Sequence, residues 1–257
     1  MNSLRLAIGF MSILPVAPRD TPMQLASARA YFPLVGLILG GILAVLDLVL
    51  RPVLPALLLS TVLVTALIVL TRALHMDGFM DSCDALLGGF TRERRLEILK
   101  DPHVGAFAVI GVVVLLLIQV TALADIPDHT RAFVLVLFPC LARWGILLSM
   151  DLFPYVRHQG LGTAFQSGRR TWQLALGFVT ALAAGVLLVG VMGIVLMALA
   201  SAVAWGLGWW ASSLLGGVTG DIYGAINEVS EAAVLVLAVV VLSRSPLALQ
   251  SPLVGLV

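Results

Sequence analysis

The sequence predicts an all-α, polytopic membrane protein with about seven transmembrane helices in one bundle. Of its 257 residues, 60% are hydrophobic and only 11% are charged, whereas a soluble domain carries about 25% charged residues. No soluble core of this size can bury so much apolar surface, so most of it is expected to face a lipid bilayer. The chain is therefore predicted to form a single membrane domain over residues 1–257.

Seven apolar stretches are candidates for the membrane-spanning helices, which need about 20 residues each. They cover residues 32–50, 53–70, 104–124, 132–150, 172–189, 194–214 and 232–242, and the last is short. They are expected to be helical because hydrocarbon offers no partner to an open strand edge. Gly36 and Gly40 are spaced for close helix packing. Residues 1–31 are predicted to form an N-terminal amphipathic segment.

The distribution of basic residues predicts the orientation in the membrane. If the N-terminus is cytoplasmic, eleven basic residues are cytoplasmic and three are outside. The cytoplasmic residues are Arg5, Arg19, Arg29, Arg72, Arg92, Arg94, Arg95, Lys100, Arg157, Arg169 and Arg170, and the outer ones are Arg51, Arg131 and Arg244. Basic residues favour the cytoplasmic side, so residues 71–103 and 215–231 are predicted to be cytoplasmic active-site loops. No basic stripe suited to nucleic acid is present.

The first of these segments carries three aspartates at helical spacing. Asp77, Asp81 and Asp84 stand at i, i+4 and i+7, which places them on one face of a helix. Carboxylates this close repel one another unless a cation neutralises them. Oxygen ligands at this density favour Mg²⁺ or Mn²⁺, with substrate phosphates completing the shell. A solvated acidic helix start is the plainer alternative, but three acids beside an apolar span favour a metal site.

The second segment is rich in glycine and carries acids without a basic neighbour in the sequence. Asp221, Glu228 and Glu231 follow a run of glycines, and no basic residue lies between Arg170 and Arg244. Glycines at a helix start expose backbone N–H groups, which suit a phosphate.

Two further basic residues are candidate partners for an anion. Arg143 lies inside the fourth predicted span without a nearby acid, so it is expected to face the bundle interior and meet an anion there. Lys100 precedes the third span near the membrane surface, where it is a candidate to hold an anionic substrate.

At these two segments the chain closely resembles the cobalamin synthase family. The family pattern His-x-Asp-Gly-x-x-Asp-x-x-Asp-Ala with paired glycines is matched by residues 75–89, and its Arg/Glu-rich continuation by residues 92–105. The late pattern Gly-x-Thr-Gly-Asp-x-x-Gly-Ala-x-Asn-Glu is matched by residues 217–228, and residues 32–36 are also similar. Met76 replaces the commoner Leu and Ala108 an expected glycine, but neither position is an acidic ligand.

The resemblance implies the last assembly step of cobalamin biosynthesis at the bacterial inner membrane. The adenosylcobinamide-phosphate group of adenosylcobinamide-GDP would pass to α-ribazole or its 5′-phosphate, and GMP would be released on the cytoplasmic side. Breaking a pyrophosphate needs cations across its oxygens and an oriented hydroxyl, so Mg²⁺ is the expected cofactor.

The implied site residues fall within the matched motifs and on the isolated basic residues. Asp77, Asp81 and Asp84 are expected to bind Mg²⁺, while Asp221 and Glu228 either complete a second metal site or take the hydroxyl proton. The residues expected to bind substrate are His75, Lys100, Asp101, Arg143, Thr219, Gly220 and Asn227.

Two other functional classes were weighed. Membrane prenyltransferases and CDP-alcohol phosphotransferases also place aspartate-rich helices at the cytoplasmic face. The latter resemble Asp-x-x-Asp-Gly-x-x-Ala-Arg, but here Gly78 directly follows the first aspartate and no Ala-Arg pair comes after it. An ion-coupled transporter would place its charges near the bilayer midplane, whereas these acids cluster at the ends of spans. The acceptor, the number of metals and the oligomeric state are left open.

Overall fold

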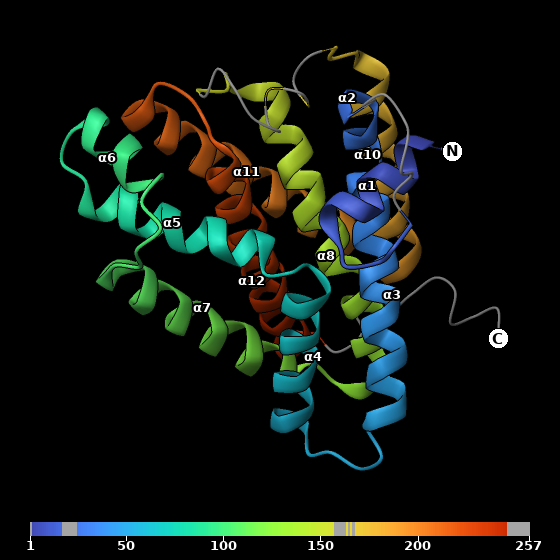
Figure 1. Cartoon of the computed structure of the whole chain (residues 1–257). Coiled ribbons are helices and arrows are strands. Elements are labelled where there is room, and N and C mark those ends of the chain that lie inside the picture. The colour runs from blue at the N-terminus through green and yellow to red at the C-terminus, as the bar shows by residue number, and fades with distance from the viewer. Residues whose placement is uncertain (1, 17–24, 157–162, 164, 166–167, 246–257) are drawn as a thin grey trace.

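The computed structural model describes residues 2–16, 25–156, 163, 165 and 168–245. Helices make up most of these residues (Figure 1). They are α1 (Asn2–Met11), α2 (Leu25–Ala28), the 3₁₀ turn η1 (Arg29–Tyr31), α3 (Phe32–Leu50), α4 (Ala56–Leu70), α5 (Leu74–Gly88), α6 (Arg92–Ile98), α7 (Ala106–Asp125), α8 (Asp128–Leu152), α10 (Thr171–Val189), α11 (Met192–Leu215) and α12 (Gly220–Arg244). Arg19 and Arg157, which contribute to the charge asymmetry, lie outside the described residues.

The predicted membrane bundle is confirmed. Within the described residues, six helices are long and apolar enough to cross a bilayer: α3 with the turns before it, α7, α8, α10, α11 and α12. The expected second span is the exception, because α4 has only 15 residues. It qualifies only together with α5, and the two are bent by 92°. Counting this pair as one broken span gives the predicted seven.

The break between α4 and α5 is built from two residues in the left-handed region. Arg72 has φ 55° and Ala73 has φ 54°, values that are uncommon outside glycine. The chain after α1 holds this break. The Arg72 guanidinium donates to the Ser12 carbonyl oxygen at 3.1 Å, and the Ile13 amide donates to the Leu70 carbonyl at 2.8 Å. The polypeptide thereby turns so that α5 lies across the bundle, against α12 (Figure 1).

Helix α8 forms the centre of the bundle, and α3 packs closely along it. In the most apolar part of α8, 83% of the residues are buried. A Cβ atom on Gly36 would lie 2.4 Å from the Pro139 carbonyl oxygen, and one on Gly40 would lie 2.5 Å from that of Leu135. The close packing predicted for these two glycines is confirmed.

Away from α5, a buried ion pair joins α3 to α8. Asp47 is fully buried, and one of its oxygens lies 3.7 Å from Nη1 of Arg131. Arg51 also contacts Asp47. This pair links the end of α3 to the start of α8, away from the acidic motifs in α5 and α12.

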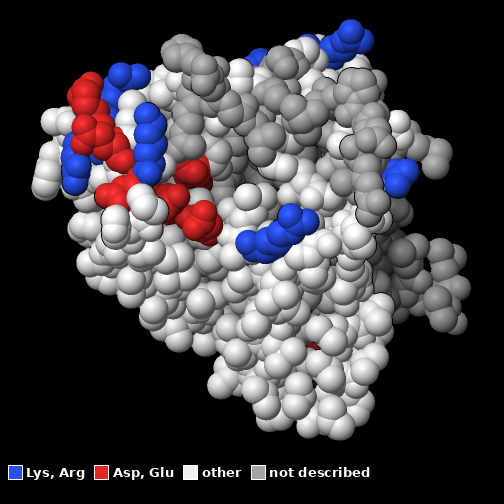
Figure 2. Space-filling model, in the orientation of Figure 1, with Lys and Arg blue, Asp and Glu red and all other residues white. Residues whose placement is uncertain are grey.

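The surface divides into a charged part and a broad apolar part. Figure 2 shows Asp, Glu, Lys and Arg gathered toward one end of the molecule, while most of the remaining face carries no charged residue. Large apolar side chains are exposed on several spans, among them Val49 on α3, Leu117 on α7, and Trp205 and Trp209 on α11. Exposed apolar helix faces are what lipid requires.

The structure corrects the description of residues 71–103 and 215–231 as loops. The first segment is mostly helix, as α5 and α6. In the second, α12 begins at Gly220 and continues unbroken to Arg244. The first half of α12 is polar because its side chains pair inside the bundle, and not because the segment is irregular.

Candidate active site

The two acidic motifs meet where α5 crosses α12. A Cβ atom on Gly78 would lie 2.9 Å from both Cα and the carbonyl oxygen of Asp221. One turn along α12, a Cβ atom on Gly224 would lie 2.6 Å from the His75 carbonyl oxygen. Glycines at both points let the two backbones approach this closely. The two segments that were predicted to lie on the same side of the membrane are therefore in contact.

Three aspartates surround this crossing, and we call them the acidic face: Asp77, Asp81 and Asp221. Asp77 is exposed, and Asp81 and Asp221 are partly exposed. Asp77 and Asp81 share one side of α5, next to the glycine that packs on α12. The Thr219 hydroxyl caps α12 by accepting from the Ile222 amide at 3.4 Å, and it lies 3.1 Å from Oδ2 of Asp221. Thr219 itself is buried, so it orients the start of α12.

Asp84 is directed away from the acidic face, toward the start of α7. Its Oδ2 accepts from the Gly105 amide at 2.6 Å, and its Oδ1 accepts from the Ala108 amide at 2.9 Å. A carboxylate in this position accepts hydrogen bonds from N–H groups that have no partner within the helix. Its negative charge also interacts favourably with the partial positive charge at the N-terminus of α7. The structure therefore gives Asp84 a capping role that the regular spacing of the three aspartates did not reveal.

The acidic face fits Mg²⁺ better than a metal that needs a full cage of protein ligands. Among the described residues, no group of three or more His, Cys, Asp or Glu side chains is gathered closely enough to hold a metal ion. Mg²⁺ usually binds through one or two carboxylates, several waters and substrate phosphates. Two carboxylates supplied by Asp77, Asp81 or Asp221 are compatible with that pattern.

A second polar group lies inside the bundle, and we call it the inner cluster: Arg143, Asn227, Glu228 and Glu231. Arg143 Nη1 lies 3.0 Å from Oε1 of Glu231, and Asn227 Nδ2 donates to the same oxygen at 3.0 Å. The side chain of Gln119 on α7 donates to Glu228 Oε2 at 3.3 Å. All four members are at least 94% buried. The prediction that Arg143 faces the interior and meets an anion is confirmed.

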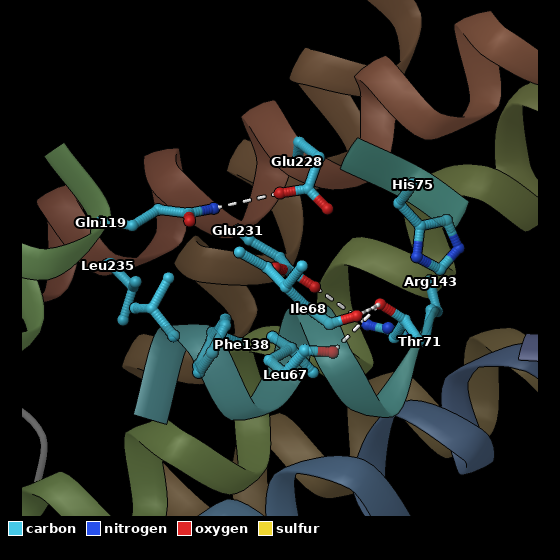
Figure 3. Close-up of a pocket in the computed structure, with 11 residues that line it drawn as sticks. Leu67, Ile68, Thr71, His75, Gln119, Phe138, Arg143, Glu228, Glu231 and Leu235 are labelled. Carbon is cyan, nitrogen blue, oxygen red and sulfur yellow. Dashed lines mark hydrogen bonds and ion pairs between the residues drawn. The ribbon is translucent and has the colours of Figure 1, made fainter. Parts of the chain in front are cut away.

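The inner cluster borders a small cavity, shown in Figure 3. His75 from α5 and Thr71 from the bend beside it also line the cavity, so His75 is buried and is not on the surface. Along α12, Glu228 is two turns from Asp221, or about 10 Å at 1.5 Å per residue. The i, i+7 spacing puts both acids on one side of the helix, but this distance keeps them out of a single metal shell.

The glycines before α12 shape a turn and offer less of a phosphate cradle than expected. Gly216 ends α11 with φ 81°, and Gly217 follows with φ 157°. A Cβ atom on Gly217 would lie 2.4 Å from the Pro154 carbonyl oxygen. The Val218 amide donates to that same carbonyl at 2.8 Å, so it is not available to a ligand. Gly220 is exposed at the beginning of the helix.

Lys100 and Asp101 lie exposed between α6 and α7. Asp101 Oδ1 accepts from the His103 amide at 3.0 Å and lies 2.6 Å from Nδ1 of the same residue. These hydrogen bonds, that of the side chain first, lower the pKa of the Asp101 carboxyl from its ordinary value. Asp101 thus stabilises a local turn. Lys100 is exposed and is the one of the two whose charge suits an anion.

Arg92 connects α6 to α11, a contact that the sequence did not reveal. Its Nε donates to the Leu215 carbonyl oxygen at 2.8 Å, which attaches α6 to the end of α11. The alternating Arg and Glu residues of α6 indicated only an exposed, ion-paired helix. This bond fixes the segment after the first motif beside the turn that begins the second.

Comparisons with known proteins agree over nearly the whole chain. The family model described as cobalamin-5-phosphate synthase matches residues 3–239. The adenosylcobinamide-GDP ribazoletransferase of Desulfitobacterium hafniense is 38% identical over 247 residues, covering 90% of this chain and 94% of the relative. Its namesake from Pseudomonas fluorescens (strain Pf-5) is 40% identical over 241 residues, with 90% and 96% covered. That of Syntrophobacter fumaroxidans is 39% identical over 236 residues, with 89% and 94% covered. No solved structure matches the chain.

Proposed function

This chain belongs to the cobalamin-5-phosphate synthase family, and we propose that it works as a Mg²⁺-dependent adenosylcobinamide-GDP ribazoletransferase. The observation that carries the Mg²⁺ assignment is the α5–α12 crossing. There the backbone of Asp221 lies against Gly78, between the two aspartates of α5. Acids that are 140 or more positions apart in the sequence thereby share one partly exposed face.

The proposed reaction exchanges one bond to phosphorus for another. The hydroxyl oxygen of α-ribazole, or of its 5′-phosphate, attacks the phosphorus attached to cobinamide. The bond from that phosphorus to the bridging oxygen breaks, and GMP leaves with the electron pair. The product is adenosylcobalamin or its 5′-phosphate. Mg²⁺ held by Asp77 and Asp81 would neutralise the negative charge that develops on the pyrophosphate.

The residues of the chain then have distinct tasks. Asp77 and Asp81 supply carboxylates for Mg²⁺ from α5. Asp221, oriented by the Thr219 hydroxyl, is in position to accept the proton that the attacking hydroxyl loses. Lys100 is an exposed cation between α6 and α7 and suits a phosphate of the substrate. Glu228 is assigned neither task, because it lies in the inner cluster.

We place the acidic face on the cytoplasmic side of a bacterial inner membrane. Helix α6 and the turn after it follow the aspartates of α5 in the sequence. They carry Arg92, Arg94, Arg95 and Lys100, and basic residues favour the cytoplasmic side of a membrane. The three relatives named above come from bacteria.

The test is product formation by the purified full-length protein in lipid nanodiscs. Adenosylcobinamide-GDP, Mg²⁺ and either α-ribazole or α-ribazole 5′-phosphate are supplied, and the corrinoid product and GMP are measured by chromatography. The proposal predicts equal amounts of both products and no turnover in EDTA. If no GMP forms here but pyrophosphate is released when a prenyl pyrophosphate is supplied instead, a prenyltransferase-type reaction would be favoured. Turnover that persists in EDTA would disprove the Mg²⁺ requirement but not the transferase activity.

A further inference from the structure

Arg143 is too deeply buried to contact a substrate at the acidic face. Its side chain is fully buried in the middle of α8, and its partner Glu231 is 2% exposed. Its Nη1 already contacts Glu231 Oε1 and the Pro139 carbonyl oxygen, each at 3.0 Å. The role that the sequence suggested, holding a substrate phosphate, does not suit this position.

The contacts of Arg143 lead instead along one side of α12 to the acidic face. Glu231, Asn227 and Gly224 follow one another at intervals of four and three residues, so they lie on a single stripe of the helix. Asn227 shares Glu231 Oε1 with Arg143. Gly224 packs against the His75 carbonyl oxygen of α5. The side of α12 that meets Arg143 is therefore also the side that meets α5.

Residues of α5, α8 and α12 also meet around the cavity. His75 of α5, Arg143 of α8 and both Glu228 and Glu231 of α12 line it, and Figure 3 shows His75 next to Arg143. Two buried carboxylates close to one guanidinium are tolerated only when their geometry is well held, because burying unpaired charge is costly. The cluster therefore favours one relative placement of α5, α8 and α12.

We propose that Arg143 is a positioning residue for the acidic face, acting through Glu231 and Asn227. Its ion pair holds α12 against α8 beside His75 of α5, and this sets Asp221 relative to Asp77 and Asp81. The effect on catalysis rests on the proposed function, whereas the effect on the helix crossing does not. In this account Arg143 does not contact substrate.

The experiment replaces both partners of the ion pair. Arg143→Met alone leaves Glu231 buried without its cation and is expected to lower Tm severely or prevent folding. The double variant Arg143→Met/Glu231→Leu removes both members of the ion pair, while Glu228 keeps its hydrogen bonds from Gln119 and Asn227, so it is expected to fold with a Tm close to that of the wild type. The matched control is Arg131→Met/Asp47→Leu, which removes a buried ion pair near the start of the same helix α8.

Three measurements are made on each folded variant in nanodiscs: kcat, KM for adenosylcobinamide-GDP, and amide hydrogen exchange of residues 74–81 and 220–228. In the Arg143/Glu231 double variant we expect kcat to fall about 10- to 100-fold, the cost of misplacing reacting groups by about 1 Å. KM is expected to change less than twofold, and exchange of both segments to rise about tenfold. The control is expected to leave all three unchanged.

Two outcomes would overturn the proposal. A double variant that folds normally but has a KM raised tenfold or more would show that Arg143 contacts the substrate. A double variant with wild-type kcat and wild-type exchange would show that the pair does not position the crossing. If the wild-type protein makes no product, the proposed function fails, and the hydrogen exchange measurements still decide the positioning role.

Discussion

Gly78 of α5 lies against the backbone of Asp221 of α12, with room for no additional atom between them. A Cβ atom on Gly78 would approach both Cα and the carbonyl oxygen of Asp221 to 2.9 Å, closer than side chains pack against backbone. Both groups belong to helix backbone, so neither can rotate aside. This contact is the point at which the two acidic motifs meet.

Replacing Gly78 by Ala is therefore expected to separate the motifs while leaving each of them chemically intact. The helices must shift by several tenths of an ångström or more, and we expect kcat to fall about tenfold or more. Steady-state kinetics and a thermal unfolding curve in detergent provide the measurement. Gly41→Ala is the matched control, since a Cβ atom there meets nothing within 4 Å. If Gly78→Ala keeps the wild-type rate, the closeness of the crossing is not required.

The acidic face is expected to carry the reaction through charge. Asp81→Asn and Asp221→Asn keep the shape of each side chain but remove a carboxylate. Each is expected to lower the Mg²⁺-dependent rate by orders of magnitude, because stabilising the charge of a transferring phosphoryl group is commonly worth several kcal/mol. Rates across a Mg²⁺ titration provide the measurement. Glu93→Gln on exposed α6 serves as control, because exposed pairs contribute only about 0–1 kcal/mol.

Near-normal rates and unchanged Mg²⁺ dependence in both variants would mean that the acidic face does not bind the metal. The aspartates of α5 and α12 would then be solvated helix ends. A changed Mg²⁺ dependence in only one variant would restrict the metal ligands to one helix, and a lower rate with unchanged Mg²⁺ dependence in Asp221→Asn would fit its role as proton acceptor.

Asp84 is expected to behave differently from Asp81, although both belong to the same motif. Asp84→Asn removes the charge that faces the start of α7 and one of two acceptors for its amides. We expect a loss of about 1 kcal/mol in the free energy of unfolding and an unchanged Mg²⁺ concentration for half-maximal rate. Denaturation and Mg²⁺ titrations provide the two readouts. Unchanged stability with lost Mg²⁺ dependence would restore Asp84 as a metal ligand.

The hydrogen bonds from His103 predict a pH dependence for the turn before α7. They lower the pKa of Asp101, so the turn gains stability above the ordinary pKa of the carboxyl. That stability is lost as the pH falls through the lowered value. NMR titration of ¹³C-labelled aspartate should therefore show Asp101 titrating below its ordinary range. His103→Ala should return it toward that range, and an unchanged titration in this variant would assign the shift to another cause.

The orientation in the membrane can be tested with a single cysteine in α6. The basic residues of this helix are expected to hold it in the cytoplasm. A cysteine at Glu93, introduced after Cys83 and Cys140 are replaced by Ala, should react with an impermeant maleimide in inverted vesicles and not in intact cells. A cysteine at Val53, in the turn between α3 and α4, should show the reverse pattern. Labelling of position 93 from outside would invert the predicted topology.

The sequence by itself determined the fold class, because the apolar spans, the few charges and the need for internal hydrogen bonds in lipid leave only a helical bundle. It also identified the two acidic motifs, since their residue types and order are local properties of the chain. It determined that Arg143 must find an anion, because an isolated charge inside a span is too costly to leave unpaired.

Only the tertiary structure decided which acids lie near one another. Spacing of i, i+4 and i+7 placed Asp77, Asp81 and Asp84 on one side of α5, but the start of α7, 21 residues later, captures Asp84. The same spacing linked Asp221 to Glu228, yet two turns of helix and the crossing with α5 put one at the surface and the other beside Arg143. Periodicity gives the side of a helix on which a residue lies. What that side meets depends on contacts between distant segments, and these form only when the helices pack.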